Sequence, residues 1–228
     1  MKQLALDIGL ASLPSLSNFY PGPNAAAYAH LAQCVANPSH LPEPTYLWGI
    51  EGSGKTHLLA AFAEKLREQG TPVGWLDASR LAPPAFQPSW GAVILDDCHL
   101  YTPTQQQTAF NWFINAIATA DGQPRRVIAA GNAAPLHMPL RDDLRSRLGW
   151  GQIFQLQPLD EADRRAVLRR EAEVRGVLLT AEAVDFMLNH FSRDLGSLMD
   201  LLDQLDRYAL QTRRAITVPL IKSMLEND

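Results

Sequence analysis

The feature that most constrains the fold is a phosphate-loop spacing inside the segment TYLWGIEGSGKTHLL. Residues 45–48 are β-branched, aromatic or aliphatic and lead into Gly49, and four residues then separate Gly49 from Gly54, Lys55 and Thr56. In this G-x-x-x-x-G-K-[ST] pattern, backbone N–H groups of the turn surround an anion and a helix follows. The segment therefore predicts a strand, a phosphate-binding turn and a helix that begins near Gly54.

The residue types of this loop indicate a nucleotide held together with Mg²⁺. Gly49, Gly52 and Gly54 carry no side chain that would keep a phosphate away from the backbone. We expect Lys55 to reach the β- and γ-phosphates and the Thr56 hydroxyl to bind Mg²⁺. The sequence has no N-K-x-D segment, so a GTPase is not indicated.

A second segment, GAVILDDCHL, supplies the acidic residues that such a loop requires. Its continuous apolar run, residues 92–95, is typical of a strand buried on both faces of a parallel sheet. Asp96 and Asp97 follow at the carboxyl end, where ligands bind in open α/β sheets. We expect Asp96 to bind Mg²⁺ directly or through water, and Asp97 to orient an attacking water. The alternative is that these residues cap the following helix.

The remaining part of residues 13–158 predicts alternating strands and helices. Further strands are expected at residues 73–78, 126–132 and 151–158, and a helix at 105–120 with Phe110, Phe113, Ile114 and Ile117 on one stripe. This alternation predicts an α/β fold with a doubly wound parallel sheet. Asn132, at the end of its strand, is expected to hydrogen-bond the γ-phosphate or the attacking water.

Residues 159–228 predict a small, all-helical lid domain. The stretch after Pro158 begins with acidic residues and continues with arginines, as is typical of a helix. Thr180 is expected to cap a second helix, and a last helix is expected to turn Ile221, Met224 and Leu225 inward. The predicted organisation is a tail at 1–12, an α/β domain at 13–158 and the lid.

Composition limits the class of protein. The net charge of −4 gives no support to non-specific nucleic-acid binding. The two cysteines, Cys34 and Cys98, are far apart, so neither a disulfide framework nor a zinc site is indicated. No apolar run reaches the ~18 residues of a membrane span, and no signal peptide is evident. The expected location is cytoplasmic.

The order of these motifs resembles an AAA+ ATPase of the DnaA clade over residues 13–228. NFYPGPN resembles the F-x-x-G-x-N element near the adenine pocket, which implies that Tyr20 and Asn24 contact the nucleotide. SRLGWG resembles a box whose arginine, here Arg147, acts in trans on the nucleotide of a neighbouring subunit. SRDLGSL resembles the sensor-2 segment, which implies that Arg193 faces the nucleotide.

Within this clade the sequence resembles the Hda family of DnaA-related regulators. The printed sequence ends at Asp228, after the last predicted helix, whereas initiators continue into a helix-turn-helix domain, so no sequence-specific DNA binding is expected. The resemblance implies bound ADP or ATP with Mg²⁺, weak turnover by the protein itself, and stimulation of ATP hydrolysis by the initiator DnaA. It also implies inhibition of re-initiation and assembly as a homodimer, an oligomer or a complex with another AAA+ chain.

The N-terminal segment QLALDI resembles the bacterial clamp-binding peptide Q-L-x-L-F/P-L. Gln3 matches the residue that enters a polar subsite, and Leu4, Leu6 and Ile8 match those that fill a hydrophobic pocket. Asp7 departs from the pattern, in which an apolar residue or proline is usual. The resemblance implies docking on the sliding clamp, the β subunit of DNA polymerase III, by an extended peptide. The alternative is a frayed end or a strand laid on the domain.

Two other classes of function stay open at this stage. One is an autonomous AAA+ ATPase such as a helicase-loader-like motor, which would turn over ATP by itself and depend on Lys55. The other is a DNA-binding initiator fragment, which would bind duplex DNA in a salt-sensitive way. The acidic net charge disfavours the second alternative.

Overall fold

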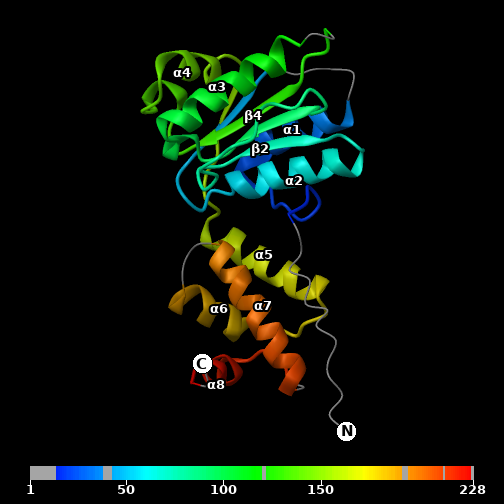
Figure 1. Cartoon of the computed structure of the whole chain (residues 1–228). Helices are drawn as coiled ribbons and strands as arrows, with labels where there is room; N and C mark the ends of the chain where they lie inside the picture. Colours follow the sequence, from blue (N-terminus) through cyan, green and yellow to red (C-terminus); the bar gives the residue numbers. More distant parts are fainter. Residues whose placement is uncertain (1–13, 38–42, 120–121, 192–194, 213, 227–228) are drawn as a thin grey trace. The chain divides into compact units, whose positions relative to one another are not determined.

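The computed structural model describes residues 14–37, 43–119, 122–191, 195–212 and 214–226. These residues form two compact units, one spanning Pro14–Pro158 and the other beginning at Leu159 (Figure 1). The predicted clamp-binding residues lie outside the described residues; they are Gln3, Leu4, Leu6 and Ile8.

The first unit is built on a parallel sheet, which confirms the α/β prediction. In the described residues the sheet has five strands in the order β2-β3-β4-β1-β5 (Figure 1). The strands are β1 (Thr45–Trp48), β2 (Val73–Leu76), β3 (Ala92–Leu95), β4 (Arg126–Gly131) and β5 (Gln152–Gln155). All neighbouring strands run parallel, so their carboxyl ends lie at one edge of the sheet.

Helices cover both faces of this sheet (Figure 1). They are α1 (Ala25–Ala36), α2 (Lys55–Glu68), α3 (Pro103–Ile117) and α4 (Asp142–Leu148), with short 3-10 turns η1 (Gly22–Asn24), η2 (Cys98–Leu100) and η3 (Pro135–His137). Strand residues alternate between the faces: Leu47 packs in the cluster that includes α1 and α2, whereas Tyr46 packs in the cluster that includes α3 and α4. Both faces of the sheet are therefore buried against helices, and this packing holds the strands in place.

The sequence prediction differs from the structure in two helices. Helix α1 was not predicted. Helix α3 begins at Pro103, where Thr102 and Gln105 form a capping box, and it ends at Ile117. Its fully buried face includes Trp112 and Phe113, with alanines beside them. The predicted stripe lies on the core side, since Phe113 is buried and Phe110 and Ile117 pack against the same cluster, but the prediction missed Trp112 and the alanines, which carry little hydrophobic signal.

The second unit is helical, as predicted. Its helices are α5 (Glu161–Val174), α6 (Ala181–His190), α7 (Leu195–Thr212) and α8 (Val218–Glu226). Thr180 caps α6 by accepting a hydrogen bond from the backbone N–H of Ala183. The expectation for Leu225 is wrong: it is 47% exposed, and α8 buries Leu220 instead. None of the helices within the described segments is long and apolar enough to span a bilayer.

Gly74 in β2 offers a test of packing at the sheet edge. A Cβ at this position would lie 2.3 Å from Cε3 of Trp90, whose ring is held by Trp112 and Phe86 at centroid distances of 4.6 and 5.5 Å. Gly74→Ala is expected to lower the free energy of unfolding by ~2 kcal/mol, measured by urea denaturation, because the ring cannot move away easily. In a Trp90→Ala background the same change should cost less than about 1 kcal/mol. Equal costs in both backgrounds would contradict this packing.

Candidate functional site

The phosphate loop (residues 49–56) connects β1 to α2 as predicted. A Cβ on Gly49 would lie 2.3 Å from the carbonyl oxygen of Leu156, so only glycine fits between these backbones. Gly52 and Gly54 have φ angles of 74° and 89°, which side chains rarely tolerate. All three predicted glycines are thus required by the shape of the turn, and α2 begins directly after it, at Lys55.

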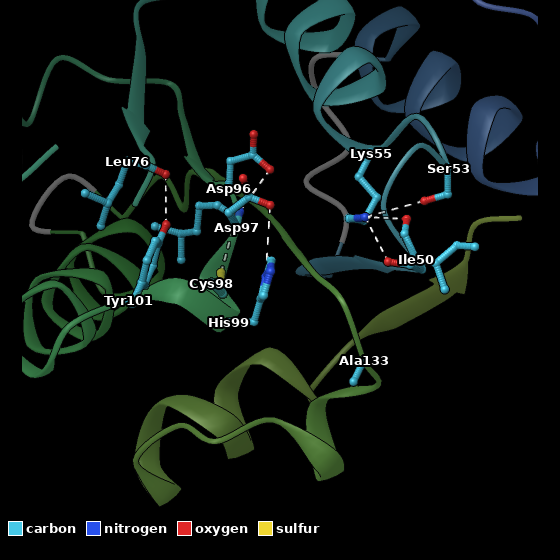
Figure 2. Close-up of polar contacts among 12 residues, drawn as sticks. Ile50, Ser53, Lys55, Leu76, Asp96, Asp97, Cys98, His99, Tyr101 and Ala133 are labelled. Atoms are coloured by element: carbon cyan, nitrogen blue, oxygen red, sulfur yellow. Dashed lines mark hydrogen bonds and ion pairs between the residues drawn. The ribbon is translucent and has the colours of Figure 1, made fainter. Parts of the chain in front are cut away.

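The Lys55 side chain lies inside the phosphate loop. Its Nζ donates hydrogen bonds to the carbonyl oxygens of Gly49 and Ile50 at 2.8 and 2.9 Å (Figure 2). The residue is only 7% exposed. An anionic phosphate oxygen is a stronger acceptor for an ammonium than a peptide carbonyl. The loop therefore places one positive charge where a phosphate would be bound.

The charges around Lys55 act in opposite directions. Burial lowers the pKa of Lys55, and the neighbouring carboxylates of Asp97, Asp96 and Glu51 raise it. Three acidic groups thus act electrostatically on one ammonium. A bound Mg²⁺ would offset this excess of negative charge.

Thr56, in the first turn of α2, lies beside Asp96 at the end of β3, and their role as Mg²⁺ ligands stays a prediction. The Thr56 hydroxyl donates a hydrogen bond to the Asp96 carboxylate, which is buried at 2% exposure. Burial, and then the charge of Asp97, raises the pKa of Asp96 to about 6. Hydroxyl and carboxylate oxygens are the ligands that Mg²⁺ prefers, and this ion usually keeps waters and phosphate oxygens besides one or two protein ligands. The donor set fits Mg²⁺.

Asp97 follows Asp96 in an unusual backbone conformation. Its φ and ψ are 50° and 42°, and no other non-glycine residue in the described segments has positive φ. Its side chain does not cap η2, and the N-terminus of α3 is capped by Thr102. The capping alternative therefore does not account for Asp97, whose carboxylate is 40% exposed beside the phosphate loop.

Asn132 emerges next to the phosphate loop. It follows β4 directly, and the preceding residue, Gly131, accepts a hydrogen bond from the Gly49 N–H at 3.3 Å. The Tyr46 hydroxyl donates to the Ala133 carbonyl at 3.0 Å and fixes the segment on its other side (Figure 2 shows Ala133). The exposed Asn132 side chain is therefore carried by a segment anchored at both ends.

The N-terminal element around residues 18–24 packs against the start of α2. The Phe19 ring lies 3.5 Å from the position that a Cβ on Gly54 would take, and 5.7 Å from the His57 ring. Phe19 is the aromatic residue of the F-x-x-G-x-N match, whereas the predicted nucleotide contact of the half-buried Tyr20 stays a prediction.

Asn24 uses its side-chain amide within the fold. It is 3% exposed, donates to the Gln157 carbonyl at 2.9 Å and accepts from the Gln157 N–H at 2.8 Å. Its predicted contact with nucleotide stays a prediction. In the structure, the Asn24 amide joins the N-terminal element to the segment after β5.

Arg147 is exposed in the last turn of α4, whereas its arginine neighbours are paired. Arg141 and Arg145 form ion pairs with Asp143 and Asp142 at 2.7 and 2.6 Å. The Arg147 guanidinium makes no hydrogen bond or ion pair with the residues that the structure describes. Its helix packs mainly on α3 and η3.

The helical unit matches a known family. Residues 160–225 match the family model described as "Hda, lid domain". The helical unit is therefore similar to the Hda lid domain. In this Hda-type lid the match extends over α5 to α8 and includes the position of Arg193, which lies outside the described residues.

Solved structures share the fold of this chain. Domain III of the Thermotoga maritima replication initiation protein DnaA is 21% identical, with a TM-score of 0.74, over 93% of this chain and 95% of that one. AMPPCP-bound DnaA from Aquifex aeolicus is 21% identical, with a TM-score of 0.68, over 87% and 66%. The Thermotoga maritima RuvB Holliday junction branch migration motor is 18% identical, with a TM-score of 0.67, over 95% and 72%.

The buried charge of Asp96 predicts that Asp96→Asn stabilises the protein when nucleotide and Mg²⁺ are removed. The pKa of Asp96 rises from 3.8 to about 6 on folding, so the folded state binds more protons in this window and stability falls as pH rises through it. The variant should gain ~2 kcal/mol in free energy of unfolding at pH 7.5, and less at pH 5, in urea denaturation.

Asp142→Asn is the control for that measurement, because its side chain is 88% exposed. It should change stability by less than about 0.5 kcal/mol at either pH. If Asp96→Asn instead lowered the free energy of unfolding by the same amount at both pH values, the buried carboxylate charge would not be destabilising.

Proposed function

We propose that this chain is an adenine-nucleotide-bound regulator that inactivates the replication initiator DnaA. The observation that carries the proposal is the exposed guanidinium of Arg147, which is unpaired within the described residues, on a helix where the neighbouring arginines are paired. A regulator of this kind would supply Arg147 to the ATP site of a neighbouring DnaA subunit and so prevent re-initiation of replication. The proposed location is the cytoplasm.

The chain's own site would hold ADP or ATP. Lys55 binds the β- and γ-phosphates, the phosphate loop donates backbone N–H groups, and Asn132 hydrogen-bonds the γ-phosphate or the attacking water. Thr56 and Asp96 hold Mg²⁺, which neutralises charge on the phosphate oxygens. The AMPPCP-bound DnaA of similar fold supports an adenine nucleotide. Tyr20, Asn24 and Arg193 complete the proposed contacts.

Arg147 would act on the partner's nucleotide rather than on its own. Its guanidinium donates to γ-phosphate oxygens as negative charge develops there, and known arginine fingers contribute about 10³ to 10⁵ in rate. A lysine cannot reproduce the planar fork. In its own site, Asp97 is shorter than glutamate, so weak turnover is expected. The assembly is a complex with DnaA, alongside a homodimer or oligomer of the chain itself.

The N-terminal peptide would locate the regulator. We infer that Gln3, Leu4, Leu6 and Ile8 dock on the sliding clamp, the β subunit of DNA polymerase III, as an extended peptide. Docking at the clamp would bring Arg147 to DnaA after replication has begun.

The decisive measurement is ATP hydrolysis by DnaA in the presence of this protein and clamp-loaded DNA. Arg147→Ala should lower the stimulation at least about tenfold, because the developing charge loses its guanidinium. Arg145→Ala is the matched control: it lies in the same helix, is paired with Asp142, and should retain stimulation. Unchanged stimulation by Arg147→Ala would end the proposed role. Robust ATP turnover by the isolated protein, lost in Lys55→Ala, would favour an autonomous AAA+ ATPase.

Clamp docking is tested by a pull-down with the sliding clamp. Deletion of residues 1–8 should abolish binding to the clamp while nucleotide binding persists. Gln3→Ala should weaken binding and Asp7→Pro should strengthen it, because proline or an apolar residue is usual at that position of such peptides. Equal capture of the full chain and the deletion variant would remove the tail from the mechanism.

A further inference from the structure

The His99 imidazole, in η2, carries a buried polar atom that the function above does not use. Its Nδ1 atom is buried and has no hydrogen-bond partner in the described part of the chain. The side chain as a whole is 18% exposed. Buried polar atoms are nearly always hydrogen-bonded, and the exceptions are often found at functional sites. A hydrogen-bond acceptor for an Nδ1–H group is therefore expected nearby.

The neighbouring acceptor is the Asp97 carboxylate. Its Oδ1 lies 4.0 Å from His99 Nδ1 (Figure 2), about 1 Å beyond hydrogen-bond range. No hydrogen bond within the described residues restrains this carboxylate, which is 40% exposed. Asp97, the N-cap residue of η2, has a left-handed backbone with φ and ψ of 50° and 42°. Such conformations cluster at active sites.

The protonation state of His99 suits donation from Nδ1. Burial is the main cause that lowers the pKa of His99; the Lys55 ammonium lowers it further, and Asp97 raises it. A neutral imidazole carries one N–H, and the other nitrogen is an acceptor. Since an ionised carboxylate can only accept, the tautomer with the proton on Nδ1 is the one that fits beside Asp97.

We propose that His99 is a positioning residue for ATP hydrolysis: its Nδ1–H donates to the Asp97 carboxylate and fixes the oxygen that faces the attacking water. The water oxygen bonds to the γ-phosphorus as the bond to the β–γ bridging oxygen breaks, which yields ADP and phosphate. One water proton passes to Asp97, and His99 keeps its own proton throughout. This inference rests on the proposed nucleotide site and on the role of Asp97 in it.

Two variants distinguish the loss of the His99 hydrogen-bond donor from a change in the shape of the side chain. Asn at position 99 places an N–H close to the position of Nδ1, and Leu has nearly the same shape without a donor. In single-turnover hydrolysis of Mg-ATP, His99→Leu should slow the step about tenfold and His99→Asn less than about threefold. The affinity for ATP should stay within about twofold for both variants, because His99 acts on the attacking water through Asp97 and does not contribute to ATP binding.

Two further measurements decide the outcome. In an Asp97→Asn background, His99→Leu should cause no additional slowing, since the positioned carboxylate is gone. Nitrogen-15 NMR of the imidazole in the ATP complex should show the proton on Nδ1, and it remains informative if His99→Leu fails to fold. Equal rates for the Leu and Asn variants, additive slowing in the double variant, or a proton on Nε2 would each overturn the proposal.

Failure of this inference is distinguishable from failure of the proposed function. A wild-type protein that binds Mg-ATP without hydrolysing it would overturn the role of His99 and leave nucleotide binding and the trans action of Arg147 intact. A wild-type protein that binds neither ATP nor ADP would remove the nucleotide site itself.

Discussion

The position of Gly49 between two backbones is the constraint on which the site depends. Strand β1 pairs with β4 on one side and β5 on the other, so Gly49 donates to the Gly131 carbonyl and closely approaches the Leu156 carbonyl. Because this register is set by buried parallel strands, the phosphate loop begins at a fixed point of the sheet edge. The acids of β3 and Asn132 after β4 reach the same edge for the same reason.

The electrostatics of this edge favour the binding of a ligand. Lys55 is buried within the loop, and its hydrogen bonds go to peptide carbonyls. Asp96 is buried with its pKa raised, beside a second carboxylate at Asp97. Unmatched buried charge of this kind lowers stability and is common where a protein binds ions, because the ligand supplies the missing charge. Phosphate would satisfy the ammonium, and a divalent cation the carboxylates.

Nucleotide binding and the action of Arg147 on a partner are predicted for residues on different elements. The groups suited to bind nucleotide gather around β1, β3 and β4, whereas Arg147 is exposed on α4 and has no partner in the described structure. A guanidinium that the fold leaves unpaired beside paired arginines is available to an anion outside the chain. This arrangement is what makes an action on a neighbouring molecule the favoured proposal, rather than catalysis confined to the chain's own loop.

The sequence by itself determined the features that depend on local spacing. The phosphate loop, the acids after β3 and the Thr180 helix cap were all read from short segments, because turn geometry and capping involve residues a few positions apart. Only the tertiary structure decided the contacts between distant or unusually placed groups. Asn24 binds the backbone of Gln157, 133 residues away, and the left-handed conformation of Asp97 brings its carboxylate near His99. No local pattern encodes the first contact, since it follows from how separately formed elements pack, and the second depends on a positive φ that aspartate adopts only uncommonly.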